Sequence, residues 1–249
     1  MAYESFAQFY DLLTSDVDYK ARFNYILELF EKYDEKPSLM LDMACGTGGF
    51  SYTARECGID VIGVDISPDM LSVARSKSDD SDILFLCQSA QELELHGTVD
   101  GAICCLDSLN HITDFEELKK AISRISLYLE EDRLFIFDLN TAYKHNKILG
   151  NNAFVFDTDD VYLVWQNESD GVRDVRIYLD FFVPHSDTYI RESEEIVERA
   201  YSVDEIDEAL IEAGMVAVAY HNDMSFEPLS ENTERMYIVA RKEKGDFNE

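Results

Sequence analysis

The chain has 249 residues, of which 46% are hydrophobic, so it can bury the core of one α/β domain with a sizeable insertion, and wholesale disorder is excluded. Its 51 acidic and 21 basic residues give a net charge of −30, which disfavours nucleic acids and anionic membranes as partners because both repel a negative surface. No apolar run approaches the ~18 residues of a membrane span. The five cysteines lack disulfide or C-x-x-C spacing, and the stretch MAYESFAQFYDLL lacks the basic start of a signal peptide, so we expect a cytoplasmic location.

Segments of helix and strand type alternate through the first half of the chain. Residues 19–33 carry apolar side chains at helical spacing and predict an amphipathic helix. Ser67 ahead of Pro68 is typical of a helix start, and Thr113 and Glu116 have the spacing of a capping box. Short apolar runs predict buried strands at 39–43, 60–65, 83–88, 100–106 and 133–139. With two further strands near the end of the chain, described below, the alternation predicts an α/β, Rossmann-like fold: a seven-stranded, mostly parallel sheet with helices on both faces.

The pattern changes after Asn140. Two runs of strand type flank NESDG, whose Asp170-Gly171 pair indicates a hairpin turn, and residues 188–200 are a third candidate strand. Ser202 and Glu205 form a second capping box, before two final strands near 216–222 and 236–242. We therefore expect a core of residues 1–140 and 200–249, interrupted by a small antiparallel β insertion, residues 141–199, that acts as a substrate lid.

The glycine-rich loop DMACGTGG, residues 42–49, follows the first predicted strand. Its third glycine is out of register for a dinucleotide fingerprint, so an NAD-dependent dehydrogenase is a minor alternative, and no P-loop is present. Asp42 precedes the glycines and suits a ligand with a cationic amine, while Asp65 ends the second strand, where a carboxylate can bind ribose hydroxyls. Together they indicate S-adenosylmethionine (SAM), and a structural turn with a strand-end Asp is the alternative.

Three segments, LDMACGTG, VIGVDISPDML and VDGAICCLDSLNHI, resemble the strand-end motifs of the class I SAM-dependent methyltransferases. The resemblance extends over nearly the whole chain. It looks closest to a bacterial, small-molecule type with an antiparallel insertion after the fifth strand, and is more distantly similar to the deoxysugar-amine N-methyltransferases. It implies an enzyme that transfers a methyl group from SAM to the nitrogen or oxygen of a small molecule.

The resemblance also assigns cofactor contacts by position. It places the methionyl part of SAM on the first glycine loop, the ribose on the acid of the second strand, and the adenine between the residues that follow these strands. Ser89 and Ala90 stand where family members usually have an Asp, which puts one adenine contact in doubt. The positions so assigned are Tyr10, Tyr19, Asp42, Ala44, Cys45, Gly46, Gly48, Asp65, Ile66, Met70, Ser89, Ala90 and Leu106.

Methyl transfer is an in-line displacement, so the protein must chiefly align the reactants, and a base is needed only for a protonated nucleophile. Asp107, Asn110 and His111 follow the fourth strand, and His111 is the most base-like, with catalysis and substrate orientation both open. Tyr10 is the second catalytic candidate, as part of an N-terminal lid. The scattered histidines and acids predict no metal site.

Other functions and partners remain possible. The chain could bind SAM without catalysis as a regulatory or interaction protein. Methylation of RNA or protein is less favoured, because the charge is negative and LDSLN replaces the N-P-P-[YF] run after the fourth strand. The expected partner is a small-molecule methyl acceptor, with no nucleic acid or membrane, and the chain is expected to be a monomer or homodimer.

Overall fold

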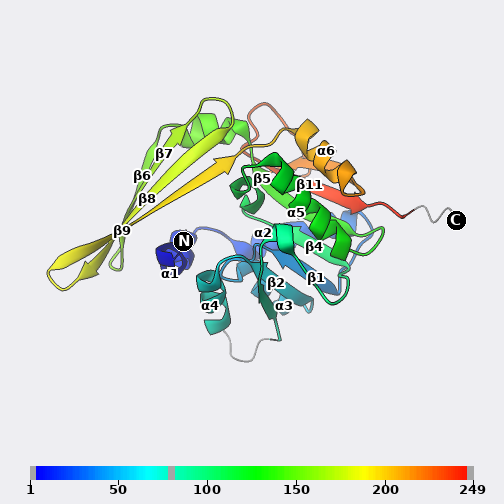
Figure 1. The fold of residues 1–249 in the computed structure, drawn as a ribbon, viewed down its shortest axis with the longest axis horizontal. Helices are drawn as coiled ribbons and strands as arrows, with labels where there is room; N and C mark the ends of the chain where they lie inside the picture. Colours follow the sequence, from blue (N-terminus) through cyan, green and yellow to red (C-terminus); the bar gives the residue numbers. More distant parts are fainter. Residues whose placement is uncertain (1–3, 78–81, 246–249) are drawn as a thin grey trace.

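The computed structural model describes residues 4–77 and 82–245, and the outermost parts of the predicted core, residues 1–3 and 246–249, lie outside this range. Its centre is a seven-stranded sheet of order β10-β11-β5-β4-β1-β2-β3, as Figure 1 shows. Strand β11 runs opposite to the other six strands of this sheet, which confirms the predicted mostly parallel sheet. The strands are β1 (Leu39–Met43), β2 (Asp60–Asp65), β3 (Leu84–Cys87), β4 (Gly101–Cys104), β5 (Leu134–Asn140), β10 (Met215–Asn222) and β11 (Arg235–Lys242).

Helices cover both faces of this sheet because its strands are apolar on both faces. Along β5, Leu134 and Ile136 belong to the core on one face, while Phe135, Phe137 and Leu139 belong to the core on the other. The first core is completed by α2 (Tyr19–Lys32), α3 (Gly49–Glu56) and α4 (Pro68–Ser76), and the second by α5 (Phe115–Tyr128) and α6 (Val203–Glu212).

The helix starts follow the sequence signals in two cases out of three. Ser67 caps α4 through its hydroxyl, and Ser202 opens α6 with a complete capping box. The predicted box at Thr113 is wrong, because Asp114 is the N-cap of α5. Its carboxylate accepts the backbone N–H of Glu116 at 2.9 Å and that of residue 117 at 3.1 Å. A carboxylate also interacts favourably with the helix dipole, so it outcompetes the neighbouring hydroxyl.

The insertion forms a separate antiparallel sheet of order β6-β7-β8-β9, which projects to one side of the core in Figure 1. The predicted hairpin turn is present, with Gly171 at a φ of +77°. One edge strand, β6, was not predicted, because most of its side chains are exposed and show no alternation. The elements of the insertion are the π-helical segment η3 (Lys144–Leu149), β6 (Ala153–Asp157), β7 (Tyr162–Ser169), β8 (Asp174–His185) and β9 (Thr188–Arg199).

One face of the insertion sheet is apolar and has its own core. Val175, Ile177, Leu179 and Phe181 alternate along β8 and are all buried, as their sequence pattern predicts. The N-terminal helix α1 (Glu4–Leu13) packs Phe9 against this core, with its ring stacked 5.9 Å from that of Phe181. Helix α1 therefore covers part of the apolar face that the four strands leave open.

The same helix is tied to the glycine loop. Asp11 in α1 accepts a hydrogen bond from the Thr47 hydroxyl at 2.6 Å and forms a 2.6 Å ion pair with Lys77. Helix α1 thus bridges the insertion and the main sheet, and it lies above the carboxyl ends of the parallel strands.

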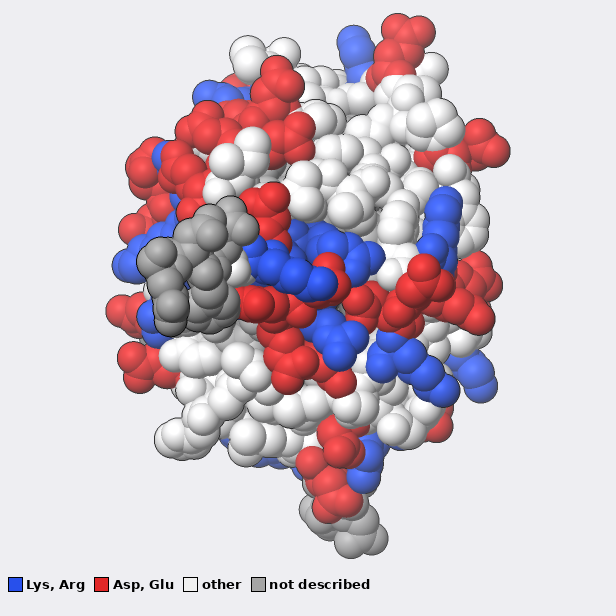
Figure 2. Space-filling model, turned by 90° about the vertical axis from the view of Figure 1, so that its right-hand side faces the viewer, with Lys and Arg blue, Asp and Glu red and all other residues white. Residues whose placement is uncertain are grey.

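Acidic side chains are spread over the face of the molecule in Figure 2, and basic side chains lie beside them rather than in a band of their own. Glu35, for example, pairs with Arg133 at 2.5 Å and with Arg241 at 3.1 Å. Across residues 4–77 and 82–245, no helix has the length and apolar character needed to cross a membrane.

Candidate functional site

A cavity of about 660 Å³ opens beyond the carboxyl ends of β1 to β5, beneath α1 and the insertion sheet. Ligands of open α/β sheets bind at this edge, and the volume lies within the ~300–1,000 Å³ of small-molecule sites. Another hollow, of about 840 Å³, lies on the insertion sheet among residues such as Gln166 and Glu195, but none of the motif residues lines it. The first cavity is therefore the candidate site.

Asp65 connects the glycine loop to the start of α4. Its Oδ2 accepts the backbone N–H of Gly46 at 2.8 Å, and its Oδ1 accepts that of Ser67 at 2.8 Å. Each carboxylate oxygen keeps a further lone pair, so Asp65 can still accept bonds from two hydroxyls of a ligand. Burial raises the pKa of Asp65, while the two N–H groups work against that rise. Beside it Ala44 and Gly46 line the cavity in left-handed conformations, with φ of +58° and +54°.

The residues predicted to pack on a base lie together at the same end. The side chain of Ile66 lines the cavity and is 63% exposed, which is unusual for a large apolar residue, while Met70 beneath it is buried. Ser89 and Ala90 line the same cavity, at the start of the 3-10 segment η1 (Ala90–Glu92). An exposed apolar side chain in a cavity offers a surface on which a flat heterocycle can pack.

Four predicted contact residues do not line the cavity: Asp42, Cys45, Gly48 and Tyr19. Asp42 is buried behind the loop, where it accepts the Ser51 hydroxyl at 2.5 Å, and burial raises its pKa to about 7. Its predicted contact with a ligand that bears a cationic amine is therefore not supported by its position.

Tyr19 stands behind the glycine loop as well. An ideal Cβ on Gly49 would lie 2.4 Å from the Tyr19 ring, so glycine is needed there for the ring to approach. The Tyr19 hydroxyl forms a hydrogen bond with Tyr10, which does line the cavity. Burial raises the pKa of Tyr10 well above its ordinary value, so its phenol stays neutral and can donate or accept a hydrogen bond.

The turn after β4 is strained and heavily braced. Leu106 and Asp107 are consecutive non-glycine residues with φ of +56° and +54°, a conformation that costs ~1–3 kcal/mol for each residue. Their two backbone N–H groups each donate to the buried Asp138 carboxylate at 2.8 Å. Arg235 donates to the carboxylates of both Asp138 and Asp107. This network holds the turn in place at the centre of the cavity.

The same network sets the charge of Asp107. Burial alone would raise its pKa, but the neighbouring basic groups, above all the Arg235 guanidinium, together outweigh burial and lower the pKa of Asp107 to about 2. Sequence reasoning found Asp107 but missed Asp138 and Arg235, which come from β5 and β11. An acid within the apolar run LFIFDLN was the only local signal for Asp138.

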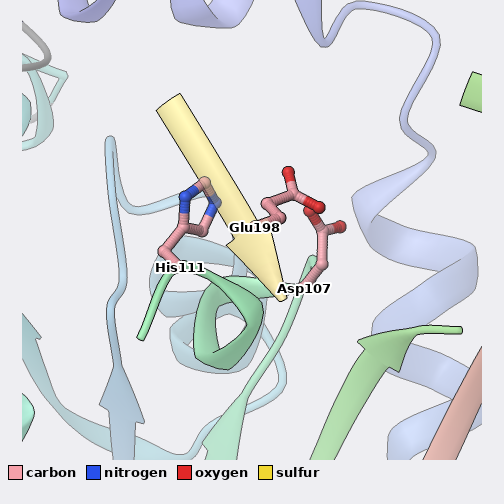
Figure 3. A group of neighbouring side chains, drawn as sticks. All are labelled: Asp107, His111 and Glu198. Atoms are coloured by element: carbon pink, nitrogen blue, oxygen red, sulfur yellow. The ribbon is translucent and has the colours of Figure 1, made fainter. Parts of the chain in front are cut away.

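His111, the predicted base, lies in a three-residue cluster. Figure 3 shows its ring beside the carboxylates of Asp107 and Glu198, and one polar atom from each residue lies within 4.8 Å of the others. Glu198 comes from the end of β9 and was not predicted, because it is one of several glutamates in RESEEIVER. Such a cluster can bind a cation or a hydrogen-bond donor, or can accept a proton.

Asn110, the third polar candidate after β4, has a structural position. Its side chain is fully buried and clamps two strand ends: its amide donates to the carbonyls of Asn140 at 3.1 Å and Arg199 at 2.8 Å, and its oxygen accepts the Asn140 N–H at 2.9 Å. It therefore holds β9 against β5 and does not contact the cavity.

The insertion sheet supplies the apolar half of the cavity. Its inner face contributes side chains from β6, β7, β8 and β9, including Trp165, whose ring stacks 6.4 Å from that of Phe156 and whose indole N–H donates to Asn167 at 2.6 Å. The cavity thus has a polar half on the main sheet and an apolar half on the insertion, with the charged cluster between them. The apolar lining residues are Phe156, Leu163, Trp165, Ile177, Leu179 and Ile196.

Comparison with known proteins gives consistent matches. Residues 40–132 match the family model described as "Methyltransferase domain". A relative from Geobacillus sp. (strain WCH70) is 31% identical over 97% of this chain and 100% of its own length, and YqeM of Bacillus subtilis (strain 168) is 29% identical over 98% of each chain; both are named "Putative methyltransferase".

Solved structures agree. The crystal structure of an S-adenosylmethionine-dependent methyltransferase from Clostridium acetobutylicum is 34% identical and superposes with a TM-score of 0.86, covering 97% of this chain and 99% of that chain. The sugar N-methyltransferase KedS8 from Streptoalloteichus sp. shares the fold, with a TM-score of 0.78 at 19% identity over 94% of this chain and 93% of that one.

Proposed function

Because this chain belongs to the class I SAM-dependent methyltransferases, we propose that it transfers the methyl group of SAM to the nitrogen or oxygen of a small molecule bound beneath the insertion sheet. The observation that carries this proposal is the division of one cavity into a half with cofactor motifs and an apolar half, with ionisable groups between them. A cofactor and an acceptor can then meet at that boundary.

The polar half fits SAM on its own geometry. Asp65 has lone pairs left for the ribose hydroxyls, and Ile66 exposes an apolar surface that the adenine would cover. The backbone at Gly46 and Leu106 lines the space that remains for the methionyl part. When bound, SAM supplies an activated methyl group on a sulfonium, so the protein's own residues need only align the acceptor and exclude water.

His111 and Tyr10 keep the roles proposed from the sequence, with one refinement. Both line the cavity, and His111 can orient the acceptor or take up its proton. Tyr10 acts as a neutral phenol in a lid, because burial raises its pKa far above neutrality. We propose that it positions the reactants and takes no proton.

The insertion, residues 141–199, would select the acceptor. Leu163, Trp165 and Ile177 present an apolar wall that excludes water and favours an acceptor with an apolar body. The cavity volume of about 660 Å³ and the net charge of −30 support a small molecule over an RNA or protein segment. A cytoplasmic location and a monomeric or homodimeric state stay predictions from composition.

Calorimetry with SAM and its product S-adenosylhomocysteine (SAH) tests the proposal. Both should bind, and Asp65→Ala should weaken them by roughly 10- to 100-fold, since it removes charge-assisted hydrogen bonds worth ~1.5–3 kcal/mol. Asp69→Ala, an exposed acid in the first turn of α4, is the matched control and should bind as wild type. An unchanged affinity in Asp65→Ala refutes the ribose assignment, and no binding by either compound refutes the proposed function.

Turnover separates an enzyme from a protein that only binds SAM. SAH release should rise when amines or alcohols with apolar bodies are added to the SAM-bound protein. If SAM binds but no acceptor of either class produces SAH, the non-catalytic alternative is favoured.

A further inference from the structure

We propose that Glu198 binds the acceptor's amino group, that the acceptor is therefore an amine with an apolar body, and that the buried His145 holds Glu198 in position. This inference rests on the proposed methyl-transfer function and names its substrate class. None of the cofactor motifs includes Glu198 or His145, which come from β9 and η3 in the insertion.

Glu198 is almost completely buried, with 5% of its surface exposed, yet it lines the cavity. Its carboxylate lies beside Asp107 and His111 in Figure 3, at the boundary between the two halves of the cavity. A buried carboxylate is costly unless it is paired, so its place here needs specific partners.

Those partners all use one oxygen. Oε2 of Glu198 accepts the Asn140 amide N–H at 3.2 Å and contacts Nε2 of His145 at 3.1 Å. Among the described residues, no hydrogen bond uses Oε1. The carboxylate is thus fixed through one oxygen, and the other is left for a ligand in the cavity.

The proton positions on His145 follow from its contacts. Its Nδ1 lies 2.8 Å from the carbonyl oxygen of Arg173, and a carbonyl only accepts, so Nδ1 must carry a proton. The contact between Nε2 and Glu198 must contain a second proton, held either by the imidazolium or by the carboxyl group. A cation at Oε1 favours the first arrangement, in which a carboxylate faces the ligand and the imidazolium compensates for its burial.

The charges around the cluster limit a ligand to at most a single positive charge. Asp107 and Asp138 share the guanidinium of Arg235, and the Lys144 side chain lies close to the same acids. Lys144 donates to the Asn140 side chain at 2.9 Å, and burial lowers the pKa of Lys144. An ammonium group brings one charge and three N–H donors for the oxygens of the cluster.

Other occupants fit the cluster less well. A divalent cation would bring two charges next to Lys144 and Arg235 and would find one oxygen of Asp107 and one of Glu198 already engaged. A hydroxyl group offers one donor, so it would satisfy fewer of the carboxylate oxygens left at Glu198 and Asp107 than an ammonium group with three donors.

The reaction is balanced for an amine. The acceptor binds as an ammonium at Glu198 and Asp107, and one proton passes to a ring nitrogen of His111 and then to solvent. The nitrogen lone pair forms the new N–C bond to the methyl carbon while the C–S bond breaks and its electron pair stays on sulfur. The products are SAH and the N-methylated ammonium.

The test uses SAH-saturated protein and two probes of equal chain length, hexylamine and 1-hexanol, titrated by calorimetry. Wild type should bind hexylamine at least tenfold more tightly than hexanol. Glu198→Gln should weaken hexylamine binding by about tenfold or more and leave hexanol unchanged. Glu195→Gln, on the same strand but exposed and paired with Arg176, is the matched control and should match wild type.

His145 needs a measurement that a purely structural role would not change. His145→Gln should lower the ratio of amine to alcohol affinity while SAH affinity stays the same. In ¹⁵N-histidine spectra of wild type with hexylamine bound, both His145 nitrogens should carry a proton, and Glu198→Gln should abolish the proton on Nε2. An unchanged affinity ratio in His145→Gln would remove it from the proposal.

Any of the following results overturns the inference. Hexylamine affinity could be the same in Glu198→Gln as in wild type, hexanol could bind as tightly as hexylamine, or hexylamine binding could require Mn²⁺ and vanish with EDTA. SAH affinity, measured first in every variant, separates these results from failure of the proposed function. If wild type binds SAH but not hexylamine, the amine assignment fails and the methyltransferase proposal stands.

Discussion

Replacement of Arg235 by glutamine should destabilise the protein by about 3–5 kcal/mol, because it removes one partner of a buried ion pair and leaves the other uncompensated. The Arg235 side chain is 9% exposed and bridges two acids, Asp138 at 0% and Asp107 at 18%. The guanidinium donates from two different nitrogens to the two carboxylates, whereas glutamine has a single uncharged amide nitrogen and cannot donate to both in the same way. The loss also loosens the strained turn at Leu106, which Asp138 holds.

The loss of stability in Arg235→Gln should depend on pH. The pKa of Asp107 is depressed from 3.8 to about 2 in the folded protein, mainly by Arg235 acting against burial. A group with a depressed pKa contributes stability that is present above its ordinary pKa and is lost as the pH falls through the folded value. The difference between wild type and Arg235→Gln should therefore be full near neutrality and should narrow as the pH falls from about 4 towards 2.

Urea unfolding followed by circular dichroism measures both effects. Arg176→Gln is the control, because Arg176 pairs with Glu195 at the surface with both side chains about half exposed, and such pairs contribute about 0–1 kcal/mol. If the free energy of unfolding of Arg235→Gln lies within about 1 kcal/mol of the wild-type value, as that of the control should, the proposed role of the network in holding the turn is refuted. If Arg235→Gln does not fold well enough for urea unfolding to be measured, Arg235→Lys can replace it. Arg235→Lys keeps the positive charge but lacks the planar guanidinium, so it should show a smaller loss in the free energy of unfolding.

Two further predictions concern the loop that carries the cofactor motifs. Burial raises the pKa of Asp42 to about 7, and a raised pKa means stability that is lost as the pH rises through that value. Asp42→Asn can still accept the Ser51 hydroxyl, so it should melt at a higher temperature than wild type above pH 7, and the gain should shrink as the pH falls and disappear below about pH 4. A difference in melting temperature that does not depend on pH would count against this account. Gly49→Ala should lower the free energy of unfolding in urea by ~1–3 kcal/mol, because its Cβ would meet the Tyr19 ring. Gly97→Ala, whose Cβ would meet open space, is the control and should lie within ~0.5 kcal/mol of wild type. Equal losses in the two variants would contradict the close approach of Tyr19 to Gly49.

The cofactor half of the site could be predicted because its signals are local. Asp65 ends a strand and Ser67 begins the next helix, so their places follow from neighbouring residues alone. The local signal was wrong at Thr113, where the neighbouring Asp114 is the cap instead. At Asp42 the local signal did not show that the side chain is buried and bonded to Ser51. Which side of a loop a residue faces depends on the packing behind it.

The charged centre of the site had no local signal. Arg235 and Asp138 are 97 positions apart, and Glu198 and His145 are 53 apart, so the sequence shows them only as scattered ionisable residues. Pairing them requires the order of the strands in the main sheet and the place where the insertion rejoins it. Asn110, a plausible active-site residue by position, becomes a clamp between β5 and β9 for the same reason.

The sequence by itself determined the class of fold and the methyl donor. Apolar periodicity sets which segments become buried strands and helices, and a glycine loop with a strand-end acid specifies an adenosine-type cofactor through backbone geometry that is local. Only the tertiary structure brings together the residues at which we propose that the acceptor binds. These include buried ionisable groups such as Glu198, whose partners are distant in the chain and whose cost of burial is compensated only when strands β5 and β9 meet.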